Sequence, residues 1–229
     1  MTNTELVISL ERAVQQYDLR RHPVYKAWMS GSLTRDDLRK YSLEYYHHAA
    51  AFQRYLREFV RRLPAGELRH EVFQVLCEEE RKIAHGARAE SWSGFAAGLV
   101  AQTTTMVSHP LPKTRQLIDI YMELARSGSE AEVLAAFYVY HSHASRVTVQ
   151  KAAALRDRYE ISDEAFEYFV SQGEVYTRHA NVWQKQLIRI LGNDPSALPY
   201  SLIAAQLAAK ALWRALDGIS SRMTSASMT

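Results

Sequence analysis

The 229-residue sequence has a single cysteine, Cys77, which excludes a disulfide framework and any zinc or iron–sulfur site built on cysteine. Glycine (9) and proline (6) are scarce, so a β-sandwich with a turn about every ten residues is excluded. No apolar run reaches the roughly 18 residues that span a membrane. The N-terminal segment has acidic residues in a helical pattern and does not look like a signal peptide. We therefore predict a cytoplasmic protein with no membrane contact.

A strong charge of one sign is also missing. There are 28 basic and 25 acidic residues, which leave a formal net charge of +3. This weak, dispersed charge does not indicate a nucleic-acid-binding surface, and the basic stretch 54–62 is typical of a solvated helix face. The sequence does hold 13 tyrosines and 9 histidines. Tyrosine and histidine are the two residue types that look enriched.

Apolar residues recur at spacings of three and four along almost the whole chain, which predicts an all-α fold. No linker or internal repeat divides the sequence, so we predict a single-domain bundle of about seven helices over residues 1–217. The small polar segment 218–229 is predicted to be a disordered tail. The expected helices span residues 3–18, a short segment around 24–28, 34–63, 67–84, 87–99, 113–127, 130–158, 162–191 and 196–217, with a polar loop at 101–113.

One face of the helix at 34–63 carries Tyr41, Tyr45, His48 and Phe52, at spacings i, i+4, i+7 and i+11. Phenols and an imidazole on an inward face suit a pocket for an aromatic ligand. The alternative is a core stripe whose polar atoms find local partners.

Two groups of carboxylates are candidates for binding a cation. Glu44 and His47 form a Glu-x-x-His pair, the motif that builds di-iron sites when it is repeated on facing helices, but no second clean pair is present. The run 78–80 (EEE), with His85 after it, is more typical of a solvated helix face. Such a run can also direct one carboxylate inward, where it needs a cation or a proton.

The two long later helices carry further polar stripes. Tyr138 and His141 share a face, whereas His143 lies on another face and is expected to be exposed. His141 and His179 can meet inside a bundle, where they would offer ligands for iron or manganese. The alternative is a pair of core histidines satisfied by local hydrogen bonds. The stripe on the helix at 162–191 consists of Tyr168, Gln172, Tyr176 and His179.

Five segments together resemble one known superfamily: 22–28 (HPVYKAW), 33–48, 78–95, 138–151 (YVYHSHASRVTVQK) and 167–180 (EYFVSQGEVYTRHA). In order and spacing they are similar to the TenA / PQQ-synthesis protein C / CADD superfamily over roughly residues 20–185, and most similar to the CADD-type proteins. The resemblance implies a haem-oxygenase-like helical bundle and a homodimer or higher homo-oligomer. CADD-type proteins resemble self-sacrificing para-aminobenzoate synthases and di-iron oxidases.

The resemblance also implies a metal site, of which this sequence keeps a part. The glutamate of the third helix matches Glu79, with Glu78 as the competitor, and the histidine after it matches His85. A glutamate of the fifth helix is replaced by His141. In the family's His-x3-Asp-x2-His stretch only the last histidine, His179, is kept.

The other two positions of that stretch hold Gln172 and Tyr176. Two of the three carboxylates that hold a di-iron pair are therefore missing, which argues against a full di-iron centre. We expect either one iron, held by Glu79, His141 and His179 with His85 or Tyr176 as a further ligand, or no metal.

Other matched positions imply substrate chemistry. The tyrosine that CADD-type proteins use as an internal source of the aromatic ring falls on Tyr25, and the lysine implicated as amine donor falls on Lys151. Pocket tyrosines of the family fall on Tyr41, Tyr45 and Tyr168.

We therefore expect an oxidoreductase that uses O2 on a small aromatic or amino-acid-like substrate. Without a metal, His141 and His179 would act as general bases while the tyrosines, with His48, Tyr138, Gln172 and Tyr176, hold the substrate. Hydrolysis of the thiaminase type is disfavoured, because Ala136 stands where that branch has its cysteine. The alternative is a non-catalytic member that binds a small molecule or a partner protein.

Overall fold

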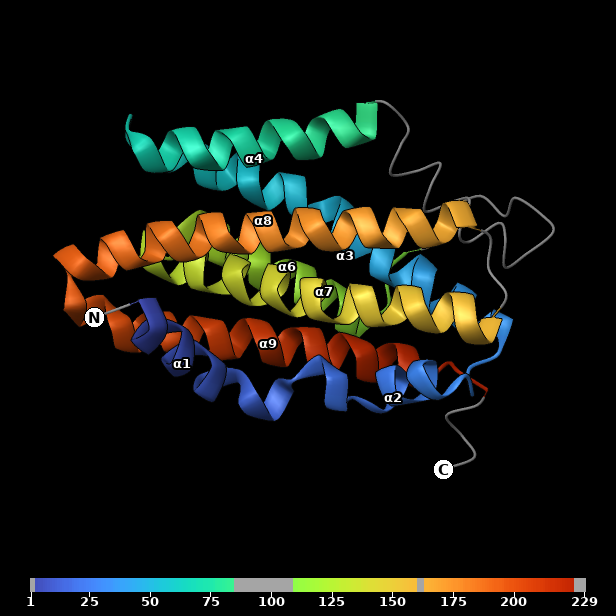
Figure 1. Ribbon diagram of the computed structural model, residues 1–229. Helices are drawn as coiled ribbons and strands as arrows, with labels where there is room; N and C mark the ends of the chain where they lie inside the picture. Colours follow the sequence, from blue (N-terminus) through green and yellow to red (C-terminus); the bar gives the residue numbers. More distant parts are fainter. Residues whose placement is uncertain (1–2, 85–108, 160–162, 225–229) are drawn as a thin grey trace.

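A computed structural model describes residues 3–84, 109–159 and 163–224, and within these ranges the chain forms eight α-helices and three 3-10 turns without any strand. The all-α prediction is confirmed. The elements are α1 (Asn3–Val14), η1 (Gln15–Tyr17), η2 (Leu19–Arg21), α2 (Pro23–Ser30), α3 (Arg35–Arg62), α4 (Glu67–Ala84), α6 (Pro112–Ser127), α7 (Glu130–Tyr159), α8 (Asp163–Asn193), η3 (Pro195–Ala197) and α9 (Leu198–Ser220) (Figure 1).

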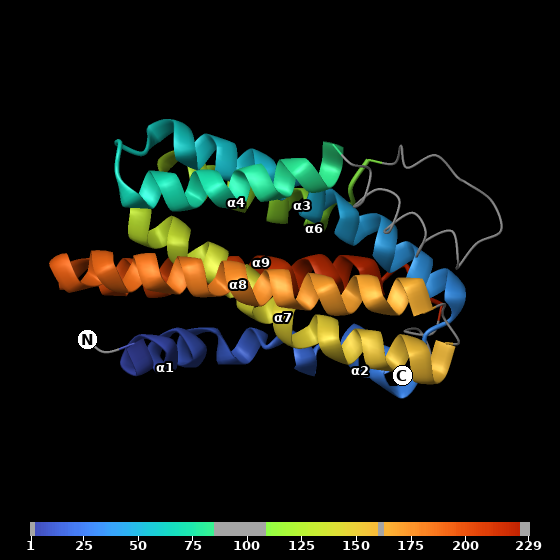
Figure 2. The same cartoon turned by 45° about the horizontal axis from the view of Figure 1, so that its top comes forward.

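Helix α7 is the centre of the bundle. It packs against α8 along its length and against α9 and α2 on other sides, while α3 packs against α4 and α6. Helix α4 lies on one side of the bundle and α1 and α2 lie on the opposite side (Figures 1 and 2). Most residues of α7 are buried, on every face of the helix, which is typical of a helix that neighbours surround. Side chains on several faces of α7 are therefore placed inside the protein.

Local sequence signals fix where α2 ends and α3 begins. Gly31 adopts a left-handed conformation, with φ of 75°, and ends α2. Thr34 then accepts a hydrogen bond from the backbone N–H of Asp37, whose carboxylate accepts from Thr34 in return. This capping box sets the start of α3 and with it the direction of its tyrosine face.

Two predicted boundaries were wrong. The first helix ends at Val14 and not at residue 18. The 3-10 turn η1 follows it, and the carboxylate of Asp18 then accepts from the backbone N–H of Arg20 at the start of η2. At the other end, the proposed disordered tail begins too early. Helix α9 continues to Ser220, Met223 is buried, and the Thr224 N–H donates to Asp37 Oδ1 at 2.8 Å.

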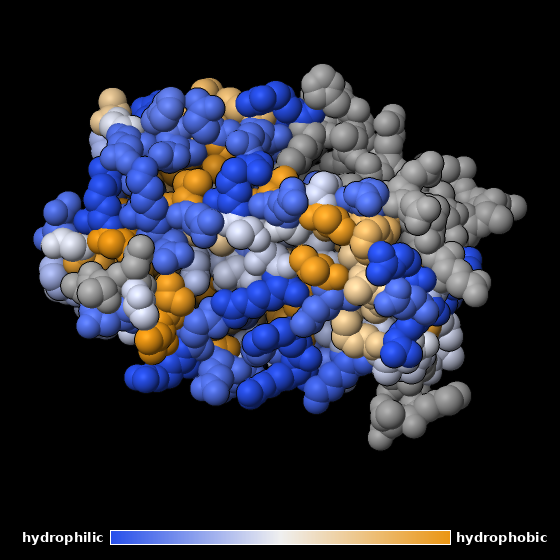
Figure 3. Space-filling model, in the orientation of Figure 1, coloured by the Kyte–Doolittle hydropathy of each residue, from blue (hydrophilic) through white to orange (hydrophobic). Residues whose placement is uncertain are grey.

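The predicted helix at 87–99 and most of the loop at 101–113 lie outside the described residues. None of the described helices is long and apolar enough to span a membrane. The face drawn in Figure 3 is mostly hydrophilic, with hydrophobic residues in small separate patches.

Candidate functional site

The first candidate cluster surrounds Lys151 of α7, which is 3% exposed. Its amine donates to Tyr41 Oη at 2.6 Å and to Tyr25 Oη at 3.2 Å, and the two phenol oxygens lie 3.0 Å apart. The Lys151 nitrogen also lies 4.5–5.3 Å from the ring centres of Tyr25, Trp28, Tyr41 and Tyr45. Helices α2, α3 and α7 thus enclose one amine among aromatic rings.

Burial sets the protonation of this cluster. It lowers the pKa of the Lys151 amine well below its usual value and raises the pKa of the Tyr25 and Tyr41 phenols. Both shifts favour uncharged groups. An uncharged amine has a free electron pair and is a nucleophile. The cluster therefore presents a nucleophilic nitrogen to the oxygen-bearing end of the Tyr25 ring.

The second candidate cluster joins α4, α7 and α8. His179 Nδ1 lies 3.4 Å from His141 Nε2 and 3.9 Å from Glu79 Oε1, and all three side chains are 1% exposed. His179 Nε2 lies 3.1 Å from Glu78 Oε2, which also accepts from Arg178. Burial raises the pKa of Glu78, but the hydrogen bonds from His179 and Arg178 outweigh it, so the pKa is below its usual value. Glu78 is therefore ionised and orients His179.

Two proton arrangements fit His141. Its Nδ1 lies 3.0 Å from the Phe137 carbonyl, an acceptor, and 3.0 Å from Trp183 Nε1, a donor. When Nδ1 accepts from Trp183, Nε2 carries the proton, and donation runs from His141 to His179 and on to Glu78. When Nδ1 instead donates to Phe137, His141 Nε2 is an unprotonated nitrogen facing His179. The first arrangement moves protons, and the second offers an electron pair to a cation.

The donor set of the second cluster matches iron in its chemistry. One carboxylate and two imidazoles are typical iron ligands. The outer nitrogen of each imidazole has a hydrogen-bond partner, which is how metal-binding histidines are usually held. In the described ranges, no three histidine, cysteine or acidic side chains already surround a point where an ion would sit. Glu79, 3.9 Å from His179, would have to approach the two rings.

Aromatic side chains connect the two clusters. The rings of Tyr41 and Tyr45 stack with centres 5.6 Å apart, and Tyr45 Oη lies 3.2 Å from Tyr140 Oη. The centre of the His141 ring lies 4.9 Å from the centre of the Tyr140 ring and 5.7 Å from the centre of the Tyr176 ring. The clusters thus share one interior between α3, α7 and α8.

Several predicted site residues meet in this interior: Tyr25, Tyr41, Tyr45, Glu79, His141, Lys151, Tyr176 and His179. His48 is buried beside Tyr140, with its Nδ1 3.4 Å from Tyr55 Oη. Gln172 is half-buried, and its Oε1 has no partner among the described residues. His85 and the side chain of Tyr168 lie outside the described residues. The roles of all these residues stay predictions.

Two residues of α7 face a different neighbour. Tyr138, predicted to contact substrate, lies beside Glu11 and Arg146 on the side of α1. His143, predicted to be exposed, is 3% exposed and lies near the same two charged side chains. Both expectations assumed one inward face of α7, but α1 covers another face.

Sequence reasoning also missed Tyr140 and Trp183. Tyr140 directly precedes His141, and Trp183 lies one helical turn after His179. Trp183 continues the stripe of Gln172, Tyr176 and His179 and could have been found, whereas Tyr140 does not have the spacing of three or four from His141 that a stripe requires.

His143 makes stability depend on pH. Burial lowers its pKa to about 4, with Arg146, Glu11, Asp18 and Arg20 as smaller influences. In the unfolded chain, His143 binds a proton near pH 6.5. The free energy of unfolding therefore decreases as the pH falls below 6.5 towards 4. His143→Gln should abolish a loss of about 2 kcal/mol between pH 7 and pH 5. Urea unfolding of both proteins at the two pH values measures this difference.

The matched control is His70→Gln, because His70 is exposed. It should leave the wild-type pH dependence unchanged. Equal pH dependence in wild type and His143→Gln would show that His143 is not held uncharged.

Comparison with known proteins supports the resemblance seen in the sequence. The model of the TENA/THI-4/PQQC family matches residues 9–191. A 4-aminobenzoate synthase of Chlamydia pneumoniae is 24% identical over 216 residues, 93% of this chain and 94% of the relative. A pyrroloquinoline-quinone synthase of Granulibacter bethesdensis is 23% identical over 224 residues, 96% of this chain and 86% of the relative.

Among solved structures, the chain is similar to a domain of unknown function with a heme oxygenase-like fold from Shewanella denitrificans. The TM-score is 0.75 at 15% identity, covering 97% of this chain and 93% of that one. At this identity the likeness shows the fold alone, and it confirms the predicted haem-oxygenase-like bundle.

Proposed function

This chain belongs to the TENA/THI-4/PQQC family, and on that premise we propose that it is an oxidoreductase that uses O2 to form a small aminated aromatic product. In this proposal Tyr25 supplies the aromatic ring and Lys151 supplies the nitrogen. The relative named 4-aminobenzoate synthase supports this class of product.

One observation carries the proposal: the Lys151 amine lies 3.2 Å from Tyr25 Oη, inside a closed aromatic cluster. A buried lysine is costly unless it is paired or neutral. Here its partners are two phenols, with no carboxylate among its hydrogen-bond partners in the described ranges. Such an arrangement costs stability, which supports a chemical role for the amine beside the ring.

Each residue of the two clusters has its own role in the proposed reaction. Lys151 presents its nitrogen, Tyr41 hydrogen-bonds to both reacting groups, and the surrounding rings exclude water. His141 and His179 accept or pass protons towards Glu78. Glu79, His141 and His179 would hold an iron, which would activate O2 when bound.

The test is the intact mass of the protein after aerobic incubation with Fe(II) and a reductant. We expect the chain to lose the mass of a tyrosine side chain, with peptide mapping placing that loss at Tyr25 and the loss of one side-chain nitrogen at Lys151. Tyr25→Phe should show no loss. Tyr200→Phe, a change at a 63% exposed tyrosine, should behave like wild type.

An unchanged mass in wild-type protein with measured iron uptake would contradict self-consumption. Stabilisation by small aromatic ligands without any turnover would then support a binding protein.

A further inference from the structure

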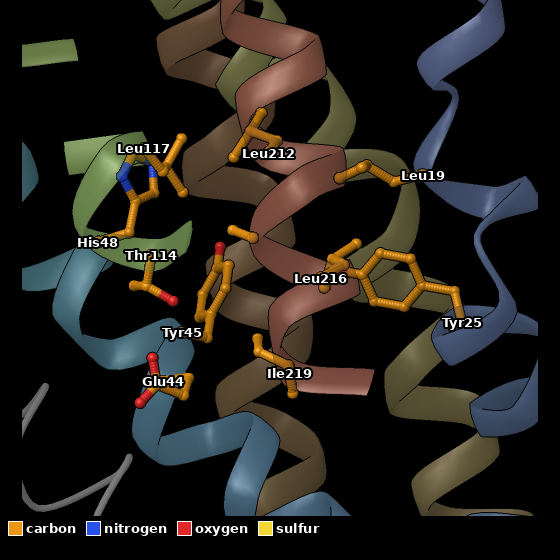
Figure 4. Close-up of a pocket in the computed structure, with 11 residues that line it drawn as sticks. Leu19, Tyr25, Glu44, Tyr45, His48, Thr114, Leu117, Leu212, Leu216 and Ile219 are labelled. Atoms are coloured by element: carbon orange, nitrogen blue, oxygen red, sulfur yellow. The ribbon is translucent and has the colours of Figure 1, made fainter. Parts of the chain in front are cut away.

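A narrow cavity of about 30 Å³ is lined by Tyr25 and Tyr45, two of the rings that surround Lys151 (Figure 4). Helices α3, α6 and α9 form most of its wall, and Tyr25 closes it from α2. The wall is mainly aliphatic, as at Leu117 and Leu216. Tyr25 therefore belongs both to the wall of the cavity and to the cluster around Lys151.

The cavity has one polar end, formed by Thr114 and Glu44. Thr114 is 2% exposed, and its Oγ1 is buried without a hydrogen-bond partner among the described residues. Glu44 uses Oε2 to accept the backbone N–H of Leu111 at 3.0 Å. A buried hydroxyl without a partner is unfavourable, so this end is suited to a polar group of a ligand.

The size of the cavity depends on Tyr25. A volume of about 30 Å³ holds about one water molecule, whereas a benzene ring occupies an apolar cavity of about 150 Å³. With Tyr25 in place, no aromatic ring fits. Loss of the Tyr25 side chain joins the space of one ring to the existing cavity, because Tyr25 is part of its wall.

We propose that this cavity is the binding site for a single aromatic ring that carries an amino group, and that the amino group donates to Thr114 and Glu44. The inference rests on the proposed function, which releases such a ring at Tyr25. His48 also lines the cavity, but the polar end presents the Glu44 carboxylate and the Thr114 hydroxyl, whose oxygens both accept hydrogen bonds from an amino group. The site therefore selects an aromatic amine at that end.

The experiment uses Tyr25→Ala, which opens the cavity, with aniline and benzene as probes of nearly equal size. Aniline should raise the melting temperature of Tyr25→Ala more than benzene does at equal concentration. The dissociation constant for aniline should be roughly tenfold lower, the scale of one or two hydrogen bonds. Wild-type protein should bind neither probe.

Adding Thr114→Val to Tyr25→Ala distinguishes a hydrogen bond between Thr114 and the amino group of aniline from packing around the aniline ring. Valine has the shape of threonine without the hydroxyl. The double variant should melt at a higher temperature than Tyr25→Ala when no probe is present, because the unpartnered hydroxyl is gone. It should also lose most of the preference for aniline. A purely structural threonine would not give these opposite effects.

Phe59→Ala is the matched control, because it removes a buried ring near the other end of α3. It should show no preference for aniline over benzene. Leu216→Ala widens the same cavity from α9 and replaces Tyr25→Ala if that variant does not fold.

Equal stabilisation by the two probes in a folded cavity variant, or no effect of Thr114→Val on the preference, would overturn the inference. The intact-mass test of wild-type protein is independent of these results. An aniline preference without loss of the Tyr25 side chain would leave the site standing and remove the proposed reaction.

Discussion

Lys151→Met is expected to abolish formation of the aminated aromatic product. Methionine keeps the length and most of the volume of lysine, so the cluster stays packed while the nitrogen is lost. Tyr25 and Tyr41 keep their mutual contact at 3.0 Å. The yield of the proposed aminated aromatic product per chain, measured by chromatography after incubation with Fe(II) and O2, should fall at least about a hundredfold.

Lys26→Met is the matched control, since Lys26 is an exposed lysine on α2, directly after Tyr25. Its product yield should equal that of wild type. A normal yield from Lys151→Met would show that the nitrogen comes from elsewhere.

The same variant tests the charge state of Lys151. The pKa of Lys151 is lowered in the folded protein, so the unfolded chain binds more protons up to its own pKa near 10.4. In wild type this makes the free energy of unfolding rise with pH. The difference in unfolding free energy, Lys151→Met minus wild type, should therefore decrease from pH 7 to about pH 10. A constant difference would show an amine that is charged in both states.

Periodicity and cap signals could predict much of the fold. The 3.6-residue pattern located most helices, and the Thr34 cap fixed the register of α3, so Tyr41 and Tyr45 could be placed on an inward face. The pairing of Tyr25 with Lys151 was available only through the family resemblance. They are 126 residues apart, and no local pattern connects them.

The remaining details depend on how helices are rotated against each other. Helix α7 is buried on all sides, so its sequence has no single apolar face, and the surroundings of Tyr138 and His143 could not be predicted. In the run 78–80, neighbouring side chains point about 100° apart on a helix. Only the packing of α4 against α3 and α8 decides which glutamate faces inward.

That packing gives the three glutamates different environments. Glu79 is 1% exposed and faces His179, whereas Glu78 is 35% exposed and holds the opposite nitrogen of His179. Glu80 is 41% exposed and pairs with Arg57 at 2.6 Å. Glutamate-to-glutamine changes at the three positions therefore form a matched series, with the same chemical change at the proposed ligand Glu79, at its neighbour Glu78 and at the more exposed Glu80.

After anaerobic loading with Fe(II), wild type is expected to hold about one iron per chain. Glu79→Gln should lower iron content to background, because it removes the only buried carboxylate near both histidines in the described residues. Glu78→Gln should weaken iron binding about 10–100-fold, since glutamine still accepts from His179 but without charge. Glu80→Gln should bind iron like wild type. Metal analysis gives the content, and stabilisation by Mn(II) against heating gives a readout that needs no turnover.

The outcomes separate three structures of the site. Two irons per chain would show that further ligands complete a di-iron centre despite Gln172 and Tyr176. No iron in wild type would leave the hydrogen-bond chain from Trp183 through His141 and His179 as the working arrangement. Glu78→Gln should then change the pH profile of product formation more than Glu79→Gln, because Glu78 is the acceptor at the end of that chain. If Glu79 on α4 completes a metal site with the histidines of α7 and α8, iron loss should be largest in Glu79→Gln, smaller in Glu78→Gln and absent in Glu80→Gln.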